Sequence, residues 1–166
     1  MRNSIFQPGK WLIVALAAFG IAMLTRGGLT GADDHAEGPQ AWHSMETVEL
    51  RITPPDAPTQ RLQVRVADDR AERAQGMQHL PAQVIRDQPI WFVFAEPRQV
   101  GWHMRNVRLA LDIAYVDAEG QVIGVERMAP NGGGYGHEQP IAAALEVAAG
   151  QAKRLGIREG TQLAID

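Results

Sequence analysis

The stretch Ile-Trp-Phe-Val-Phe-Ala at residues 90–95 is a continuous run of apolar side chains, most of them aromatic or β-branched. These residue types are enriched in strands, and an unbroken apolar run is typical of a strand that is buried on both faces. We therefore predict that residues 90–95 form the central strand of the fold.

Three shorter segments, residues 47–52, 62–66 and 100–105, alternate apolar and polar residues with a period of two, which indicates half-buried strands. Further strands are predicted at residues 111–116, 122–126, 141–147 and 162–165. The segment Asp-Ala-Glu-Gly at residues 117–120 is a suitable hairpin connection. The four glycines within residues 131–136 predict a loop.

Two short helices are expected between these strands. One begins at a cap formed by Asp68 or Asp69 and ends at Gly76, and the other spans residues 149–155. Many short strands with two small helices predict an α+β, mainly β fold: a compact antiparallel sheet or a partly closed barrel.

The N-terminus has the pattern of an export signal. Arg2 and Lys10 precede an uninterrupted apolar run at residues 11–24, which is shorter than a typical membrane span and suits a signal sequence. We predict a signal peptide or membrane anchor at residues 1–32, a flexible tether at 33–45 and one domain at 46–166. The domain is expected in the periplasm, soluble or tethered to the inner membrane, with membrane contact only through residues 11–24.

The charge distribution bears on the class of partner. Residues 1–32 contain three cations and no acid, so the rest of the chain has 13 basic and 19 acidic residues, a net charge of −6. An acidic domain argues against nucleic acid as a partner. The chain has no cysteine, which excludes a disulfide, a thiolate nucleophile and cysteine-ligated zinc. No cofactor is predicted.

Several short motifs occur in a fixed order from about residue 62 to the end. They are Arg-Ala-Gln-Gly-Met at 73–77, Trp-Phe-Val-Phe at 91–94, Trp-His-Met-Arg-Asn-Val at 102–107, Leu-Ala-Leu-Asp-Ile at 109–113, Asp-Ala-Glu-Gly-Gln-Val at 117–122 and Leu-Glu-Val-Ala-Ala-Gly at 145–150. In order and spacing they resemble the motifs of the uncharacterised bacterial and archaeal family DUF192. The resemblance implies a small β-rich fold, frequently on an exported chain, and no established activity.

This sequence differs from the family pattern at a few positions. Val107 stands where the family has threonine, Ala110 where it has proline, and a cysteine often found before the Leu-Glu segment is absent. A family site that used the threonine hydroxyl or that cysteine would be missing here.

Strand alternation predicts where the polar side chains lie. Asp112 and Glu146 each sit between apolar neighbours, so each should point away from the face that those neighbours bury. We expect one polar surface that binds a small ligand or an envelope protein, built from His103, Arg105, Asn106, Asp112 and Glu146, with Trp102 and Tyr135 nearby.

Other interpretations of the same residues remain open. If Asp112 and Glu146 shared a cleft, they could serve as an acid/base pair in a hydrolase or lyase. Asp112 could instead accept backbone hydrogen bonds, and either carboxylate could pair with an arginine such as Arg105. His103 and His137 are weak candidates for a metal site, since they lack compact ligand spacing. A protein that only supports structure or assembly is a third possibility, and the sequence favours a non-enzymatic role.

Overall fold

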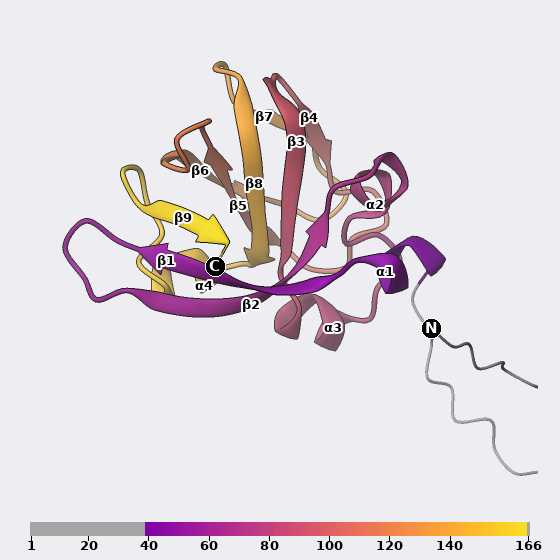
Figure 1. Ribbon diagram of the computed structural model, residues 1–166. Coiled ribbons are helices and arrows are strands. Elements are labelled where there is room, and N and C mark those ends of the chain that lie inside the picture. Colours follow the sequence, from indigo (N-terminus) through magenta and orange to yellow (C-terminus); the bar gives the residue numbers. More distant parts are fainter. Residues whose placement is uncertain (1–38, 166) are drawn as a thin grey trace, which may run out of the picture. The chain divides into compact units, whose positions relative to one another are not determined.

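The computed structural model describes residues 39–165, which fold around one curled sheet (Figure 1). The sheet consists of β1 (Thr47–Thr53), β2 (Gln60–Ala67), β3 (Ile90–Arg98), β5 (Leu111–Val116), β6 (Val122–Met128), β8 (Ile141–Ala148) and β9 (Gln162–Ile165). A separate pair is formed by β4 (Gly101–His103) and β7 (Gly133–Gly136). The helices are α1 (Gln40–Ser44), α2 (Arg70–Gln75), α3 (Ala82–Asp87) and α4 (Gln151–Arg154).

The seven strands form a half-barrel in the order β6-β5-β8-β3-β2-β1-β9. All neighbours are antiparallel except β2 and β3, which run parallel. The two edges of the sheet approach each other at one end. There the Val122 N–H donates to the Thr161 carbonyl at 2.8 Å, and the Leu163 N–H donates to the Gly120 carbonyl at 2.8 Å. The prediction of a mainly β, partly closed barrel is confirmed.

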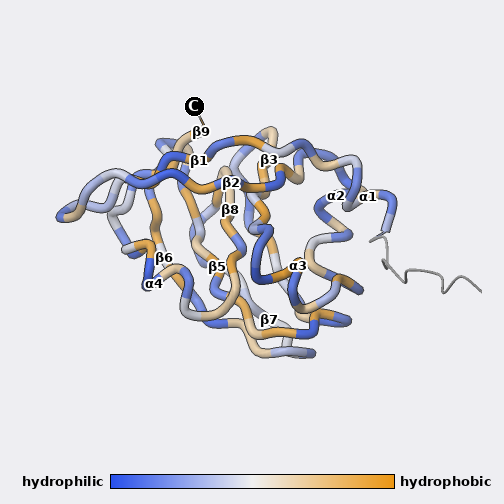
Figure 2. Tube along the Cα trace, turned by 90° about the horizontal axis from the view of Figure 1, so that it is seen from below, coloured by the Kyte–Doolittle hydropathy of each residue, from blue (hydrophilic) through white to orange (hydrophobic). Residues whose placement is uncertain are grey.

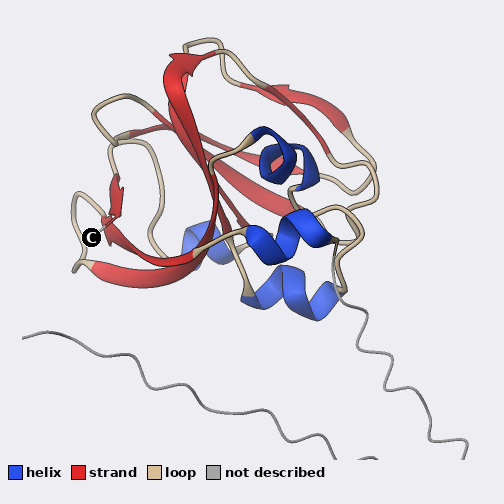
Figure 3. Ribbon diagram, turned by 45° about the vertical axis from the view of Figure 1, so that its right-hand side comes forward, coloured by secondary structure: helices blue, strands red, loops and turns tan. Residues whose placement is uncertain are grey.

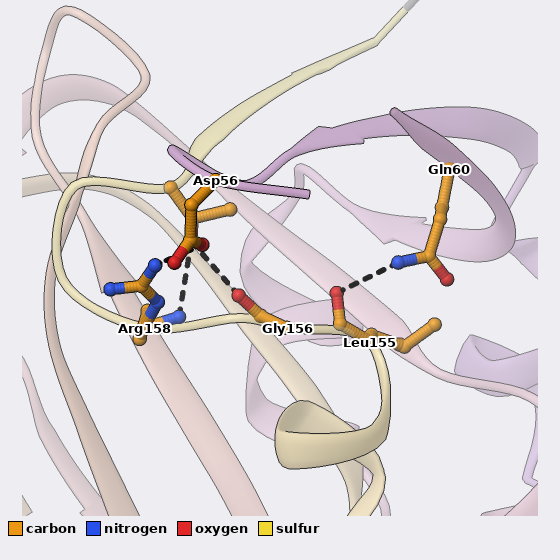
Figure 4. A network of polar contacts seen from close by, with 6 residues as sticks. Asp56, Gln60, Leu155, Gly156 and Arg158 are labelled. Atoms are coloured by element: carbon orange, nitrogen blue, oxygen red, sulfur yellow. Dashed lines mark hydrogen bonds and ion pairs between the residues drawn. The ribbon is translucent and has the colours of Figure 1, made fainter. Parts of the chain in front are cut away.

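Polar contacts hold the turn after α4 against the β1–β2 hairpin (Figure 4). Asp56 forms an ion pair with Arg158, and the Gln60 side chain donates to the Leu155 carbonyl at 3.2 Å. The fully buried Thr161 hydroxyl accepts from the Arg158 N–H and donates to the Gly156 carbonyl. These contacts fix the chain just before β9 joins the sheet.

Both faces of the central strands are buried, each in its own apolar cluster. The inner cluster fills the concave side and includes Leu145, Val147 and Trp91. The outer cluster includes Phe92, Ile113 and Tyr115. Successive side chains of a strand point to opposite faces, so neighbouring residues of β3, β5 and β8 enter different clusters. Figure 2 shows the resulting apolar character of these central strands.

Helices α1 to α3 lie together on the outer side, away from α4 (Figures 1 and 3). Helix α2 begins at Asp69, whose side chain accepts from the Glu72 N–H while the Glu72 side chain accepts from the Asp69 N–H. This reciprocal capping stabilises a helix start. Helix α1 is attached through Trp42, which is 3% exposed and lies under the Arg65 guanidinium at 4.6 Å.

Several local predictions differ from the structure. Residues 40–44 of the expected tether form α1 instead, because Trp42 and Met45 are buried. Part of the predicted glycine loop forms β7, since pairing with β4 satisfies its backbone groups. Helix α3 was not predicted. The proposed signal region, residues 1–32, lies outside the described residues, and within residues 39–165 no helix has the length and apolarity needed to cross a membrane.

Candidate functional site

A pocket of about 220 Å³ opens on the outer side of the sheet, between the α2 segment and β4. This volume is below the roughly 300 Å³ at which pockets for drug-sized ligands begin, so the pocket suits a small molecule. Its lining is largely apolar and aromatic with a few polar groups: Arg73, Ala74, Gln75, Gly76, Met77, Gln78, Phe92, Phe94, Val100, Gly101, Trp102, His103, Met104, Val107 and Glu146.

Glu146 is the acidic group of this pocket. It lies on β8 between two other central strands, opposite Ile90 of β3 and Ile113 of β5, and is 4% exposed. Its neighbour Leu145 belongs to the inner cluster, so alternation turns Glu146 to the outer face. There the helices and β4 cover the sheet. Glu146, which was predicted to lie on a polar surface, is therefore buried among apolar side chains.

The environment of Glu146 changes its protonation. Burial raises the pKa of Glu146 to about 8, although a hydrogen bond with the Trp102 side chain acts in the opposite direction. Removing a carboxylate from water disfavours its charged form, whereas an N–H donor favours it. The carboxyl is therefore mostly neutral at pH 7 unless a positive charge reaches it.

Trp102 connects the pocket to a cluster of aromatic rings. Strand β4 brings it over the outer face, where its ring lies edge to face with Phe92 at 6.1 Å and Phe94 at 6.3 Å between centroids. It also contacts Tyr115 at 5.8 Å. Such edge-to-face pairs have a preferred geometry and stabilise the arrangement of the rings. Trp102 therefore forms an aromatic wall of the pocket beside Glu146.

The α2 segment forms the opposite wall. The Arg73 guanidinium lies over the Phe94 ring at 5.6 Å, and its Nη1 donates to the Val93 carbonyl at 2.9 Å and to the Asp68 carbonyl. These bonds hold the side chain at one edge of the pocket. Gly76 ends the helix with φ +46°, a conformation that favours glycine, and the chain then turns back into the pocket at Met77.

Two residues with positive φ connect two of the chain segments that contribute to the pocket. His79 has φ 61° and Asn106 has φ 59°, although neither is glycine. The His79 N–H donates to the Asn106 carbonyl at 2.9 Å, and their side chains hydrogen-bond at 3.1 Å. A residue other than glycine usually adopts a positive φ only where surrounding contacts hold its backbone. Here the contacts between His79 and Asn106 join the chain segments that carry the pocket residues Met77 and Met104. Sequence reasoning missed His79, whose pattern gave no signal.

The expectation that Asp112 and Glu146 share a face is wrong. Asp112 pairs with Val147 in the β5–β8 register, whereas Glu146 pairs with Ile113. The two carboxyl groups therefore point to opposite sides of the sheet. Asp112 forms an ion pair with Arg127 and accepts the Gly150 N–H at 2.6 Å, which ties β5 to the start of α4.

The other predicted site residues are dispersed. Of the polar candidates on residues 103–106, His103 lines the pocket, whereas Arg105 and Asn106 are exposed and do not line it. The Tyr135 hydroxyl accepts the Ala129 N–H at 2.9 Å. His137 contacts the Tyr115 ring at 5.6 Å. No group of three histidine, aspartate or glutamate side chains within residues 39–165 could hold a metal ion. The single polar surface expected from strand alternation is therefore absent from the described part of the chain.

Solved structures share this fold. A putative transcription regulator from Sinorhizobium meliloti 1021 is 30% identical with a TM-score of 0.68, covering 74% of this chain and 95% of its own. A protein of unknown function from Novosphingobium aromaticivorans DSM 12444 is 24% identical with a TM-score of 0.66, covering 72% of this chain and 86% of its own. No curated protein matches the chain.

The match to a family model extends over most of the described domain. It covers residues 51–165 and is described as an uncharacterized ACR family. These residues include every strand of the half-barrel except the first part of β1, and all of the pocket lining. The chain belongs to the family DUF192.

Proposed function

We propose that this protein is an exported binding module that holds a small molecule in the pocket above Glu146. The observation that carries the proposal is a buried carboxyl at a cavity of about 220 Å³. A buried ionisable group is costly without a partner, and apolar pockets with a few convergent polar groups are typical ligand sites. Export is supported by the cations and apolar run of residues 1–24.

The arrangement supports binding better than the hydrolase or lyase considered from sequence. That chemistry required two neighbouring carboxyl groups, and Asp112 points to the other side of the sheet from Glu146. Asp112 is also engaged by Arg127 and the Gly150 N–H. A single carboxyl beside an indole can anchor a ligand but does not supply an acid/base pair.

The S. meliloti protein is described as a putative transcription regulator, and that role is assigned to that protein alone. In this chain, the residues after 32 include 19 acidic and 13 basic side chains, and this net negative charge does not favour a DNA-binding role. We therefore propose a small molecule as the ligand.

The test is a fragment screen of the full chain in a non-ionic detergent, read by NMR of methionine methyl groups. Met77 and Met104 line the pocket, whereas Met128 lies in the outer cluster without lining it. We expect at least one fragment, whether cationic, neutral or anionic, to shift the methyl signals of Met77 and Met104 together. The affinity of that fragment should differ between the parent protein and Glu146→Gln. Glu159→Gln, a change of an exposed carboxylate outside the pocket, serves as the control.

Two results would contradict the proposal. One is a broad screen in which no fragment shifts Met77 or Met104. The other is binding that Glu146→Gln and Glu159→Gln leave equally unchanged.

A further inference from the structure

We propose that the pocket binds a small organic ammonium ion, with the charged nitrogen against the Glu146 carboxylate and the carbon groups against Trp102 and Phe92. The inference rests on the proposed function and adds the chemical class of the ligand.

The first argument is the charge of the pocket. Among the lining residues within 39–165, Glu146 is the single acidic one, and it is nearly inaccessible to water. A cation that pairs with a buried carboxylate offsets part of the cost of burying its charge, because the attraction is strong where water is excluded. The hydrogen bond with Trp102 already favours the ionised carboxylate that such a pair requires.

The second argument is the chemistry of the walls. Three aromatic rings line the pocket: Trp102 contacts Phe92 at 6.1 Å and Phe94 at 6.3 Å between ring centroids. Aromatic faces attract cations, tryptophan most strongly, and groups of aromatic rings are used in proteins to recognise quaternary ammonium ligands. Met77 and Met104 add polarizable side chains that adapt to alkyl groups.

Arg73 limits the kind of cation. Its guanidinium lines the same pocket but is held at the Phe94 edge by the carbonyls of Asp68 and Val93. A ligand with a second positive group would be repelled there. The pocket therefore fits a molecule with one ammonium group, which enters toward Glu146.

Binding of such an ion should depend on pH, because Glu146 must lose its proton first. The titratable and charged groups around Glu146 come from four elements. Arg73 of α2 and His103 of β4 line the same pocket, and Tyr115 of β5 interacts electrostatically with Glu146. The Tyr115 hydroxyl donates to Glu126 of β6 at 2.8 Å. Burial raises the pKa of Tyr115, and its bond to Glu126 acts in the same direction, so Tyr115 stays neutral as Glu146 ionises.

The experiment uses two matched pairs of probes and isothermal titration calorimetry of the full chain. Choline is compared with dimethylbutanol, in which carbon replaces the nitrogen, and isoamylamine with isoamyl alcohol. We expect at least one ammonium probe to bind about tenfold or more tightly than its uncharged partner. Its affinity should rise about tenfold between pH 7 and pH 9, as the Glu146 carboxyl with a pKa of about 8 ionises.

Variants identify the responsible group. Glu146→Gln should remove both the preference for the ammonium probe and the rise with pH, whereas His103→Gln should keep the rise. Equal binding of charged and uncharged probes, or no binding of either ammonium, would overturn the ammonium assignment. If other fragments still shift Met77 and Met104, the pocket binds a small molecule of another class and the proposed function stands; if none does, both proposals fail.

Discussion

Replacing Glu146 with glutamine should make the protein more stable at neutral pH. The folded protein keeps the Glu146 carboxyl protonated up to a pKa of about 8, whereas the unfolded chain releases that proton near the ordinary value of 4.5. Below pH 4.5 both states are protonated and the carboxyl imposes no penalty. As the pH rises from 4.5 toward 8, the unfolded state gains stability by ionising and the folded state does not, so stability is progressively lost.

The size of the effect follows from this interval. At about 1.4 kcal/mol per pH unit, the interval from pH 4.5 to pH 7 corresponds to about 3 kcal/mol. Glutamine has nearly the same shape and stays neutral, so Glu146→Gln should recover much of this free energy at pH 7. For a domain of this size, that corresponds to a rise in melting temperature on the order of 10 °C.

The assay is thermal and urea unfolding of both proteins, followed by circular dichroism at several pH values without added ligand. The variant should be more stable than the parent at pH 7, and the difference should shrink toward zero at pH 4. Glu159→Gln should follow the parent at every pH. A Glu146→Gln protein that is less stable at pH 7, or a difference that does not vary with pH, would refute this description of the buried carboxyl.

Three further substitutions test the contacts that shape the domain. Asp112→Asn should lower the free energy of unfolding by about 1–3 kcal/mol, because the ion pair with Arg127 is lost, and should leave fragment binding unchanged; impaired binding at unchanged stability would contradict its assignment to the opposite face. Thr161→Val removes a fully buried hydroxyl that accepts one hydrogen bond and donates another, and should lower the free energy of unfolding in urea by about 1–3 kcal/mol. An unchanged free energy of unfolding would show that these two bonds do not stabilise the end of the barrel. Asp69→Ala removes the cap of α2 and should cost about 1 kcal/mol, with Asp68→Ala as the neighbouring comparison; equal effects of the two would argue against the capping role.

Much of the fold could be predicted from local patterns. The run at residues 90–95 indicated a buried strand, and β3 lies between β2 and β8 in the middle of the sheet. Residues 90–92 are buried as predicted, whereas Val93 and Phe94 are half-buried and Ala95 is exposed. The capping signal at Asp69 and the hairpin ending at Gly120 also agree with the structure, where Gly120 has φ 82°. The cap and the hairpin depend on interactions between residues close in sequence, and the strand is marked by its own composition, so the sequence carries these signals directly.

The site could be predicted only in part. Alternation correctly separates Glu146 from Leu145, but it does not show that a second layer covers the outer face. That layer depends on α1 to α3 and on the β4–β7 pair, whose positions are set by contacts between distant parts of the chain. The partner of Asp112 likewise depends on the β5–β6 register, which places Arg127 opposite it.

The role of Glu146 as the ionisable group of a ligand pocket is tested most directly by its own titration. The carboxyl carbon of Glu146 can be followed by NMR from pH 5 to pH 10, with and without saturating choline or isoamylamine, and assigned through Glu146→Gln. We predict a pKa of about 8 in the free protein and a value at least about one pH unit lower with the ammonium ion bound. An ordinary pKa in the free protein, or a raised pKa that neither cation changes, would contradict this assignment.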